Sequence, residues 1–319
     1  MRIFCDYETD GAGEQPIGIA DGRERIRTNL AGVGATIALA SARGGVGKSV
    51  LAVNIAAALA LKGMKVAIVD ADLNSPSIAA MLGMKPSRNF PMVEGIEPVA
   101  GPHGLRMVSS AQLSGGEAPA ISFAQDYDQP DYDQTDGQSD GHVTAPAPKT
   151  PALLSYSQGL HRMLGQTQFG TVDLLIIDLA SGLDRLHSMA AMVSLDGVLL
   201  LSHPSEHASH AARHAIEIAS AIDAPIVGIV ENMIGFNCDG CRSVRPLWPK
   251  GDLHGVAREL KVPVIARLAF EPRLADSSDR GALFVRDYAS TPTGKSLLDL
   301  AGQIEAMIAA RARAAQTQA

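Results

Sequence analysis

An apolar run and a glycine-rich turn follow one another at residues 35–49, which read Ala35-Thr36-Ile37-Ala38-Leu39-Ala40-Ser41-Ala42-Arg43-Gly44-Gly45-Val46-Gly47-Lys48-Ser49. The first six residues have the continuous apolar character of a buried strand. After the turn, apolar residues and many alanines fill positions 49–61 and Gly63 follows, which predicts a buried helix that stops there. A strand, a glycine-rich turn ending in Lys-Ser, and a helix in this order indicate a phosphate-binding P-loop.

Phosphate chemistry explains the composition of this turn. Glycines let the backbone bend around a phosphate with several N–H groups pointing inward, and the helix N-terminus adds partial positive charge. We expect Lys48 to reach the β- and γ-phosphates and Ser49 to hold Mg²⁺ through its hydroxyl. A glycine-rich turn without a ligand is the alternative. The loop residues expected to bind ATP are Ala42, Arg43, Gly44, Gly45, Val46, Gly47, Lys48, Ser49 and Val50.

Further short apolar runs lie at residues 66–70, 174–178, 197–201 and 225–230, and they are continuous rather than alternating with polar residues. Strands buried on both faces have this composition, which indicates a parallel sheet covered by helices. Helical stretches lie between the runs, for example at 207–222. We therefore expect the α/β class, with a doubly wound, mainly parallel sheet and helices on both faces.

Aspartates close two of these predicted strands. Asp70 and Asp72 stand at the end of the strand after the P-loop helix, and Asp178 closes the run at 174–178. Ligands of open α/β sheets bind at the carboxyl ends of the strands, so we expect these carboxylates to face the phosphates and Mg²⁺. We assign Asp72 to orienting the attacking water and Asp178 to the Mg²⁺ side of the site. Capping of the strand ends is the alternative.

The composition is that of a globular enzyme, with 46% apolar and 19% charged residues. The net charge of −7 argues against a nucleic-acid partner, because the phosphate backbone is held by clustered Lys and Arg. The sequence has no apolar run near the roughly 18 residues that span a bilayer. The first residues lack the basic start and apolar stretch of a signal peptide, so we expect a cytoplasmic protein without a membrane partner.

The expected organisation has three parts. Residues 1–35 are polar and weakly periodic, and we interpret them as a flexible N-terminal extension. The P-loop domain is expected at 36–310, followed by a tail at 311–319. An acidic disordered insertion interrupts the domain at about 114–150, since 126–140 holds six aspartates and no Lys or Arg. Binding of a cation or a basic partner is the alternative for this acidic segment.

Cysteine chemistry points to a second site. The chain has three cysteines, Cys5, Cys238 and Cys241. Two thiolates two residues apart can ligate one metal, but a closed site needs about four ligands. A symmetric dimer that supplies four thiolates is therefore an economical solution, with Cys5 as a distant bystander. A thioredoxin-like redox pair, a zinc site and a pair without a role remain open.

With these residues in view, the chain resembles the deviant-Walker P-loop ATPases, the group of MinD, ParA and the nitrogenase iron protein. Within that group it is most similar to the Mrp/ApbC-type iron–sulfur cluster carriers. The likeness runs from about residue 37 to residue 310. The residues that carry it are 43–49, Asp70-Ala71-Asp72-Leu73-Asn74-Ser75-Pro76-Ser77, 175–178, Gly228-Ile229-Val230-Glu231-Asn232-Met233, Cys238-Asp239-Gly240-Cys241, and 271–281.

This resemblance implies an ATP-dependent homodimer. Each subunit would contribute Cys238 and Cys241 to one bridging 4Fe–4S cluster, which is held and then passed to iron–sulfur apoproteins. Asn232 falls where the family contacts the adenine base. Hydrolysis would use Lys48 and Arg43 against the phosphate charge, with Asp72 positioning the water.

The sequence departs from the family pattern in three places. The signature lysine, which crosses the dimer to the partner's nucleotide, is Arg43 here, and a guanidinium is not interchangeable with an ammonium. The segment after the Walker B acid usually reads Pro-Pro-Gly, and here it is Leu179-Ala180-Ser181-Gly182. A Pro-Leu-Asp-Pro run is replaced by Ala269-Phe270-Glu271-Pro272. These departures bear on the rate and the dimer coupling of hydrolysis rather than on nucleotide binding.

Two other functions stay open from the sequence. One is a MinD/ParA-like positioning ATPase, for which the cysteine pair would have no use, and the other is a scaffold that binds ATP without hydrolysing it. We interpret a histidine cluster as a solvated helix face rather than a metal site. The apolar positions of a C-terminal helix at 295–310 are interpreted as core packing rather than a membrane anchor. The clustered histidines are His203, His207, His210 and His214.

Overall fold

The computed structural model describes residues 7–8, 17–84, 95–110, 156–237, 243–249 and 251–318. Its centre is an eight-stranded sheet in the order β12-β9-β8-β3-β7-β4-β6-β5. Neighbouring strands are parallel except β5 and β6. The strands of this sheet are β3 (Thr36–Ala40), β4 (Val66–Ala71), β5 (Val99–Ala100), β6 (Arg106–Ser109), β7 (Leu174–Leu179), β8 (Gly197–Ser202), β9 (Ile226–Glu231) and β12 (Val264–Arg267).

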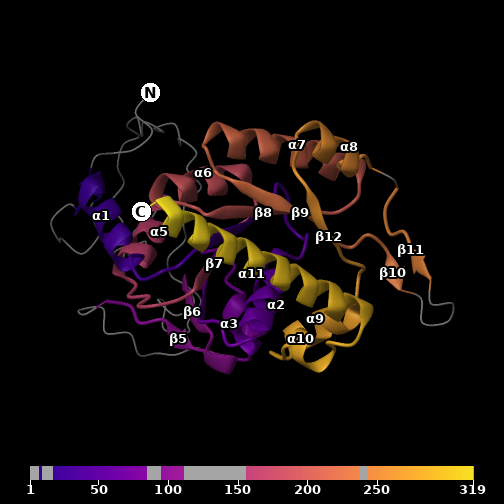
Figure 1. Cartoon of the computed structure of the whole chain (residues 1–319), viewed down its shortest axis with the longest axis horizontal. Helices are drawn as coiled ribbons and strands as arrows, with labels where there is room; N and C mark the ends of the chain where they lie inside the picture. Colours follow the sequence, from indigo (N-terminus) through magenta and orange to yellow (C-terminus); the bar gives the residue numbers. More distant parts are fainter. Residues whose placement is uncertain are drawn as a thin grey trace, which may run out of the picture.

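Helices cover both faces of the sheet, and each face has its own apolar core (Figure 1). The helices on one face are α1 (Ile19–Asn29), α5 (Tyr156–Gln166), α6 (Leu183–Met192), α7 (Glu206–Ala221) and α8 (Leu253–Glu259). The helices on the other face are α2 (Lys48–Leu61), α3 (Ile78–Met81), α9 (Pro272–Asp279), α10 (Phe284–Asp287) and α11 (Pro292–Gln318). A short 3₁₀ turn, η1, spans Pro102–Gly104.

Burial on both faces explains the continuous apolar runs of the sequence. In β7, all six residues are buried, and alternate side chains enter opposite cores: Leu175 and Ile177 one, Leu174 and Ile176 the other. The same holds for β3, β4 and β8, whose residues are buried throughout. The expected α/β class with a mainly parallel sheet and helices on both faces is confirmed.

The N-terminal part differs from the expected flexible extension at 1–35. Residues 19–29 form α1, which packs against α5, and the Ile26 side chain is only 1% exposed. The Asn29 side-chain amide donates to the carbonyls of Leu164 and Gly165, at 3.1 and 2.8 Å. A two-stranded sheet of β1 (Tyr7–Glu8) and β2 (Ile17–Gly18) precedes α1. Residues 19–35 therefore belong to the folded body.

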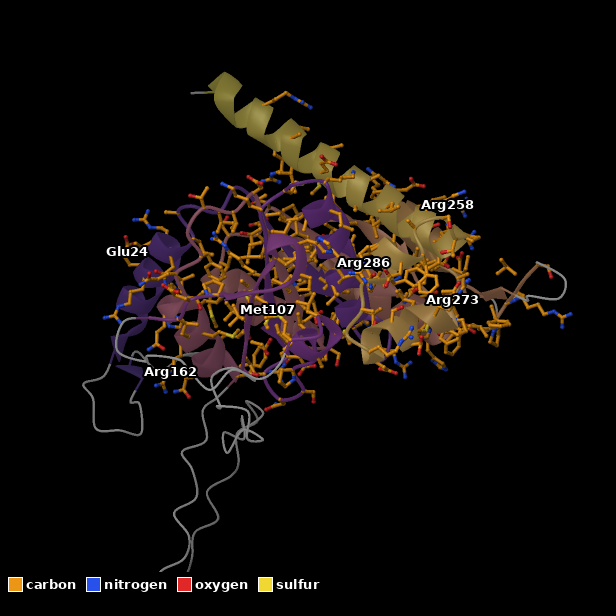
Figure 2. The ribbon with its side chains drawn as sticks, turned by 90° about the horizontal axis from the view of Figure 1, so that it is seen from below. Glu24, Met107, Arg162, Arg258, Arg273 and Arg286 are labelled. Carbon is orange, nitrogen blue, oxygen red and sulfur yellow. The ribbon has the colours of Figure 1, made fainter. Side chains whose placement is uncertain are left out.

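The C-terminal end also differs from the expectation. Helix α11 continues to Gln318 instead of ending near 310, so residues 311–318 are helical rather than a separate tail. Arg311 anchors this part, since its guanidinium donates to the Asp196 carbonyl at 2.8 Å and pairs with the Asp196 carboxylate at 3.1 Å. Helix α11 runs diagonally across the body, and its last turns project beyond it in the second view (Figures 1 and 2). Among the described residues, no helix has the length and apolar character needed to cross a bilayer.

A small hairpin stands apart from the main sheet. Its strands are β10 (Phe236–Asn237) and β11 (Val244–Arg245), which pair antiparallel. Both views show it away from the body, beyond β12 (Figures 1 and 2). Cys238 and Cys241 belong to the connection between its two strands and lie outside the described residues, as do Cys5 and the acidic segment at 114–150.

Candidate functional site

The P-loop connects β3 to α2 at the carboxyl edge of the sheet, next to the central strands β7 and β8. Gly45 and Gly47 have positive φ angles of 76° and 87°, which L side chains rarely adopt. A Cβ atom on Gly45 would meet nothing within 4 Å, so the loop is open to a ligand there. Because α2 begins at Lys48, its first N–H groups and partial positive charge are directed toward this opening.

Asp178 brings a buried negative charge to the same edge. In the sheet it is paired with Leu39 of β3 on one side and with Asp70 of β4 on the other. Its carboxylate is fully buried, and neither oxygen has a hydrogen-bond partner among the described residues. Burial raises the pKa of Asp178 to about 6, against the opposing influence of the Ser49 hydroxyl and the Lys48 ammonium.

These groups fit a divalent cation. A buried carboxylate without a protein partner is costly unless a counter-charge satisfies it, and carboxylate and hydroxyl oxygens are ligands that Mg²⁺ accepts. Ser49, half-buried at the start of α2, is near enough to act on the carboxyl of Asp178. Lys48 is 8% exposed, and its ammonium is near enough to act on the carboxyl of Asp178. The residues expected to hold phosphate and Mg²⁺ therefore lie together.

The two aspartates after β4 play different parts. The fully buried carboxylate of Asp70 accepts the backbone N–H groups of Ser77 and Ile78 at 2.8 and 3.0 Å, so it holds the turn before α3. Burial, with Asp178 next in effect, raises the pKa of Asp70 to about 7. Asp70 thus caps local backbone instead of facing a ligand, which corrects the expectation for this residue. Asp72 is only half-buried and accepts the Ser75 N–H at 3.2 Å.

The segment after Asp178 lies directly against the P-loop. The N–H of Gly182 donates to the Ser41 carbonyl at 3.1 Å. A Cβ on Gly44 would lie 3.5 Å from the Ser181 hydroxyl, so these residues are neighbours. Gly182 has φ 120° and ψ 148°, a conformation that is essentially open to glycine alone. A movement of residues 179–182 would therefore displace the P-loop directly.

Asn232 braces the P-loop from the other side. It follows β9 and is 5% exposed. Its amide donates to the Val46 carbonyl at 2.9 Å, and its own N–H donates to the Ser202 carbonyl at 2.7 Å. A Cβ on Gly47 would come within 2.7 Å of that amide, so only glycine permits this approach. Sequence reasoning placed Asn232 beside the nucleotide but did not anticipate this contact with the loop.

Aromatic stacking joins the hairpin side of the molecule to the carboxyl edge of the sheet. The rings of His203 and Trp248 are stacked, with centroids 4.3 Å apart and an interplanar angle of 9°. The Trp248 indole N–H donates to the Met233 carbonyl at 3.0 Å, one residue beyond Asn232. Burial, followed by the charge of Arg43, lowers the pKa of His203. Arg43 itself is exposed on the loop.

Glu231 is another residue that sequence reasoning did not single out as a site residue. It is 2% exposed, and its carboxylate accepts from Arg267 at 2.6 Å and lies 3.3 Å from the His254 imidazole. The Glu-Asn pair is visible in the sequence, but Arg267 and His254, which contact Glu231, are distant from it in the chain.

The four histidines expected on one solvated helix face have different surroundings. The ring of His203 stacks on Trp248, and Nδ1 of His214 lies 3.4 Å from the Glu217 carboxylate. Groups of three or more metal-binding side chains are absent from the described ranges.

The fold and this site define a P-loop nucleotide-binding protein. A family model described as the NUBPL iron-transfer P-loop NTPase, of ParA type, matches residues 32–124 and 154–305. The chain belongs to this family of iron–sulfur cluster carrier P-loop NTPases.

Individual relatives agree with this membership. The iron–sulfur cluster carrier protein of Methanococcus maripaludis is 31% identical over 263 residues, covering 82% of this chain and 81% of the relative. A nucleotide-binding protein of Archaeoglobus fulgidus, solved in complex with ADP, superposes with a TM-score of 0.62 at 25% identity over 85% of this chain and 95% of that one. The cell division protein MinD of Aquifex aeolicus superposes with a TM-score of 0.54 at 17% identity, covering 85% and 97%, and shares the fold.

Proposed function

We propose that this protein binds ATP with Mg²⁺ at the carboxyl edge of its sheet, hydrolyses it, and carries a 4Fe–4S cluster between two copies of the chain. The observation that carries the nucleotide part is the buried carboxylate of Asp178, whose oxygens accept no hydrogen bond within the described residues and which stands beside Ser49 and Lys48. An open glycine loop and a helix N-terminus face the same place. Membership of the carrier family supports the cluster part.

Each residue has a distinct part in the proposed hydrolysis. The backbone N–H groups of residues 42–50 surround the phosphates, and Lys48 neutralises the charge of the β- and γ-phosphates. Ser49 and Asp178 hold Mg²⁺, whose chemistry is to neutralise charge that develops on the phosphate oxygens. Asp72, half-buried at the end of the neighbouring strand β4, orients the attacking water. Arg43, exposed on the loop, extends to the nucleotide of the second subunit.

The cluster is the cargo in this proposal. In the sequence Cys238 follows directly on β10 and Cys241 precedes β11, so both cysteines belong to the connection of one hairpin. Two such hairpins in a homodimer supply four thiolates, the number that a 4Fe–4S cluster takes. Recipient apoproteins then take the cluster from these thiolates by ligand exchange.

A path of direct contacts leads from the P-loop to Trp248, close in the sequence to the hairpin. The P-loop carbonyl of Val46 is held by Asn232, and the next residue, Met233, accepts from Trp248. Trp248 lies three residues after β11, the second strand of the hairpin. Nucleotide-dependent movement of the P-loop is therefore transmitted to the cysteine hairpin through this path, which couples hydrolysis to holding or releasing the cluster.

Phosphate release and nucleotide binding test the ATPase part. We expect Lys48→Ala to abolish both, because the ammonium stands against the phosphates, while Lys65→Ala, at an exposed lysine, leaves both unchanged. Arg43→Ala should lower hydrolysis by on the order of 100-fold and leave ATP affinity nearly unaltered, as expected for a cation that serves the partner's transition state. Hydrolysis equal to the parent in Lys48→Ala would refute the assignment of the site.

A nucleotide-switched positioning ATPase without a cluster is the second candidate. The structural similarity to MinD favours it at the level of fold. Iron content distinguishes the two functions, because the second one predicts a protein that binds and hydrolyses nucleotide normally but retains no cluster.

A further inference from the structure

Tyr156 is a buried tyrosine at the ends of the two neighbouring strands that carry the site aspartates. It is the first residue of α5 and is 2% exposed. Its hydroxyl donates to the carbonyl of Ala71 at 2.9 Å. Ala71 ends β4 and directly precedes Asp72, the residue proposed to orient water. The phenol therefore fixes the backbone from which Asp72 extends.

The same hydroxyl also lies close to the segment after Asp178. Burial raises the pKa of Tyr156, so the phenol keeps its proton, and the nearby backbone N–H of Ala180 opposes that rise. A hydroxyl can donate one hydrogen bond and accept others at once, so the bond to Ala71 leaves the phenol oxygen available to this N–H. One side chain thus lies against both the end of β4 and the segment that follows β7.

Arg185 packs over the face of the tyrosine ring. Its guanidinium lies 4.0 Å from the ring centroid, in cation–π geometry, and only 14% of its side chain is exposed. Arg185 belongs to α6, which begins right after Gly182. The ring therefore packs against the helix that follows the segment 180–182, and the hydroxyl lies beside the start of that segment.

The backbone chemistry of this segment makes the contact possible. Ala180 has a backbone N–H, which a proline at this position would lack. The segment Leu179-Ala180-Ser181-Gly182 contains no proline, so its backbone is not restricted by a pyrrolidine ring. The Gly182 bond to Ser41 restrains the far end of the segment, and the tyrosine hydroxyl lies beside its start.

We propose that Tyr156 is a positioning residue for ATP hydrolysis: through the backbones of Ala71 and Ala180 it fixes Asp72 and Asp178 relative to one another and to the P-loop. This inference rests on the proposed ATPase activity. In this proposal Tyr156 acts through these two backbones and not on the nucleotide itself. Its effect is on the geometry of hydrolysis and not on the affinity for ATP.

The first test compares Tyr156→Phe with Tyr288→Phe, a half-buried tyrosine at the α10–α11 junction. Phenylalanine keeps the ring and its packing on Arg185 but loses the hydroxyl. We expect kcat for phosphate release to fall about tenfold in Tyr156→Phe, with KM and the Kd for ATP within about twofold, since one buried hydrogen-bonding group is lost. Tyr288→Phe should match the parent. An unchanged kcat, or equal losses in kcat and ATP affinity, overturns the proposal.

The second test adds Ala180→Pro, which removes the N–H and restricts the segment by its ring instead. In the Ala180→Pro background, Tyr156→Phe should lower kcat by about twofold or less, because the restraint on the segment no longer depends on the hydroxyl. An equally large fall in kcat in both backgrounds would contradict the proposal, because the hydroxyl would then act elsewhere.

Hydrogen exchange separates this inference from the ATPase proposal. The amides at 180–182 should exchange faster in Tyr156→Phe than in the parent or in Tyr288→Phe, with no nucleotide present. If the parent does not hydrolyse ATP, the proposed activity is wrong, but the exchange rates still show whether Tyr156 restrains residues 180–182. Equal exchange rates in all three proteins would refute this restraint.

Discussion

At the scale of single residues, the electrostatics of the site depend on carboxylates that are buried before any ligand arrives. Asp178 and Asp70 are both fully buried, and burial raises the pKa of each, to about 6 and about 7. The Asp70 carboxylate accepts from three backbone N–H groups, whereas the Asp178 carboxylate has no such partner among the described residues. The protein thus holds a destabilising charge where the cation is proposed to bind.

A charge of this kind gives stability a specific dependence on pH. Because the folded-state pKa of Asp178 is raised, the folded protein binds the proton more tightly than the unfolded chain between about pH 4 and pH 6. Its contribution to the free energy of unfolding therefore becomes less favourable as pH rises through this window, by on the order of 1 kcal/mol per pH unit.

We expect Asp178→Asn, without Mg²⁺ or nucleotide, to be more stable than the parent at pH 8. The difference should shrink as pH falls through about 6, because the parent's carboxyl then becomes neutral as well. Urea titrations at several pH values measure this, with Asp173→Asn as a control at an exposed aspartate. A variant less stable than the parent at pH 8 would mean that Asp178 has stabilising partners without the cation.

At the scale of elements, periodicity and strand-end residues predict the parts that are buried on both sides. The predicted strands around 66–70, 174–178 and 197–201 agree with β4, β7 and β8 to within a residue or so. The sequence does not predict helix α1, because Ile26 stands among charged residues and the helix shows no clear apolar periodicity. The hairpin strands β10 and β11 have two residues each, which is too short for any period to show.

The placement of α1 in the folded body has a measurable consequence. We expect Ile26→Ala to lower the free energy of unfolding by about 2–4 kcal/mol, because a buried branched side chain is removed from a packed core. Arg25→Ala, at an exposed position on the same helix, should change it by less than about 0.5 kcal/mol. Chemical denaturation of both variants provides the comparison. Equal, small effects would mean that α1 does not contribute to the core.

The contact path between the P-loop and the hairpin has a built-in probe. The chain contains one tryptophan, Trp248, which stacks on His203 and bonds to Met233. We expect ATP with Mg²⁺ to change the tryptophan emission of the parent, and His203→Ala to change the emission before nucleotide is added. Lys48→Ala should show no response to ATP. Saturating ATP without effect on the parent's emission would argue against this path.

At the scale of the whole molecule, the sequence predicts which site residues lie together, but it does not predict the hydrogen bonds that hold them in place. Parallel strands bring their carboxyl ends to one edge, so a P-loop after β3 and an aspartate at the end of β7 place Lys48, Ser49 and Asp178 together. The bonds that support them come from residues far apart in the chain, such as Tyr156 with Ala71 and Asn232 with Val46. These are side-chain to backbone contacts, and backbone acceptors leave no trace in the sequence.

Iron reconstitution tests the central claim, that two copies of this chain carry one cluster. The parent, Cys238→Ala and Cys5→Ala are treated anaerobically with iron and sulfide, then measured by visible absorption, size-exclusion chromatography and iron content. We expect the parent and Cys5→Ala to form dimers with about four irons and the broad absorption of a 4Fe–4S cluster, and Cys238→Ala to retain none. A parent that binds ATP but holds no cluster would contradict the claim and favour a nucleotide-switched protein without iron.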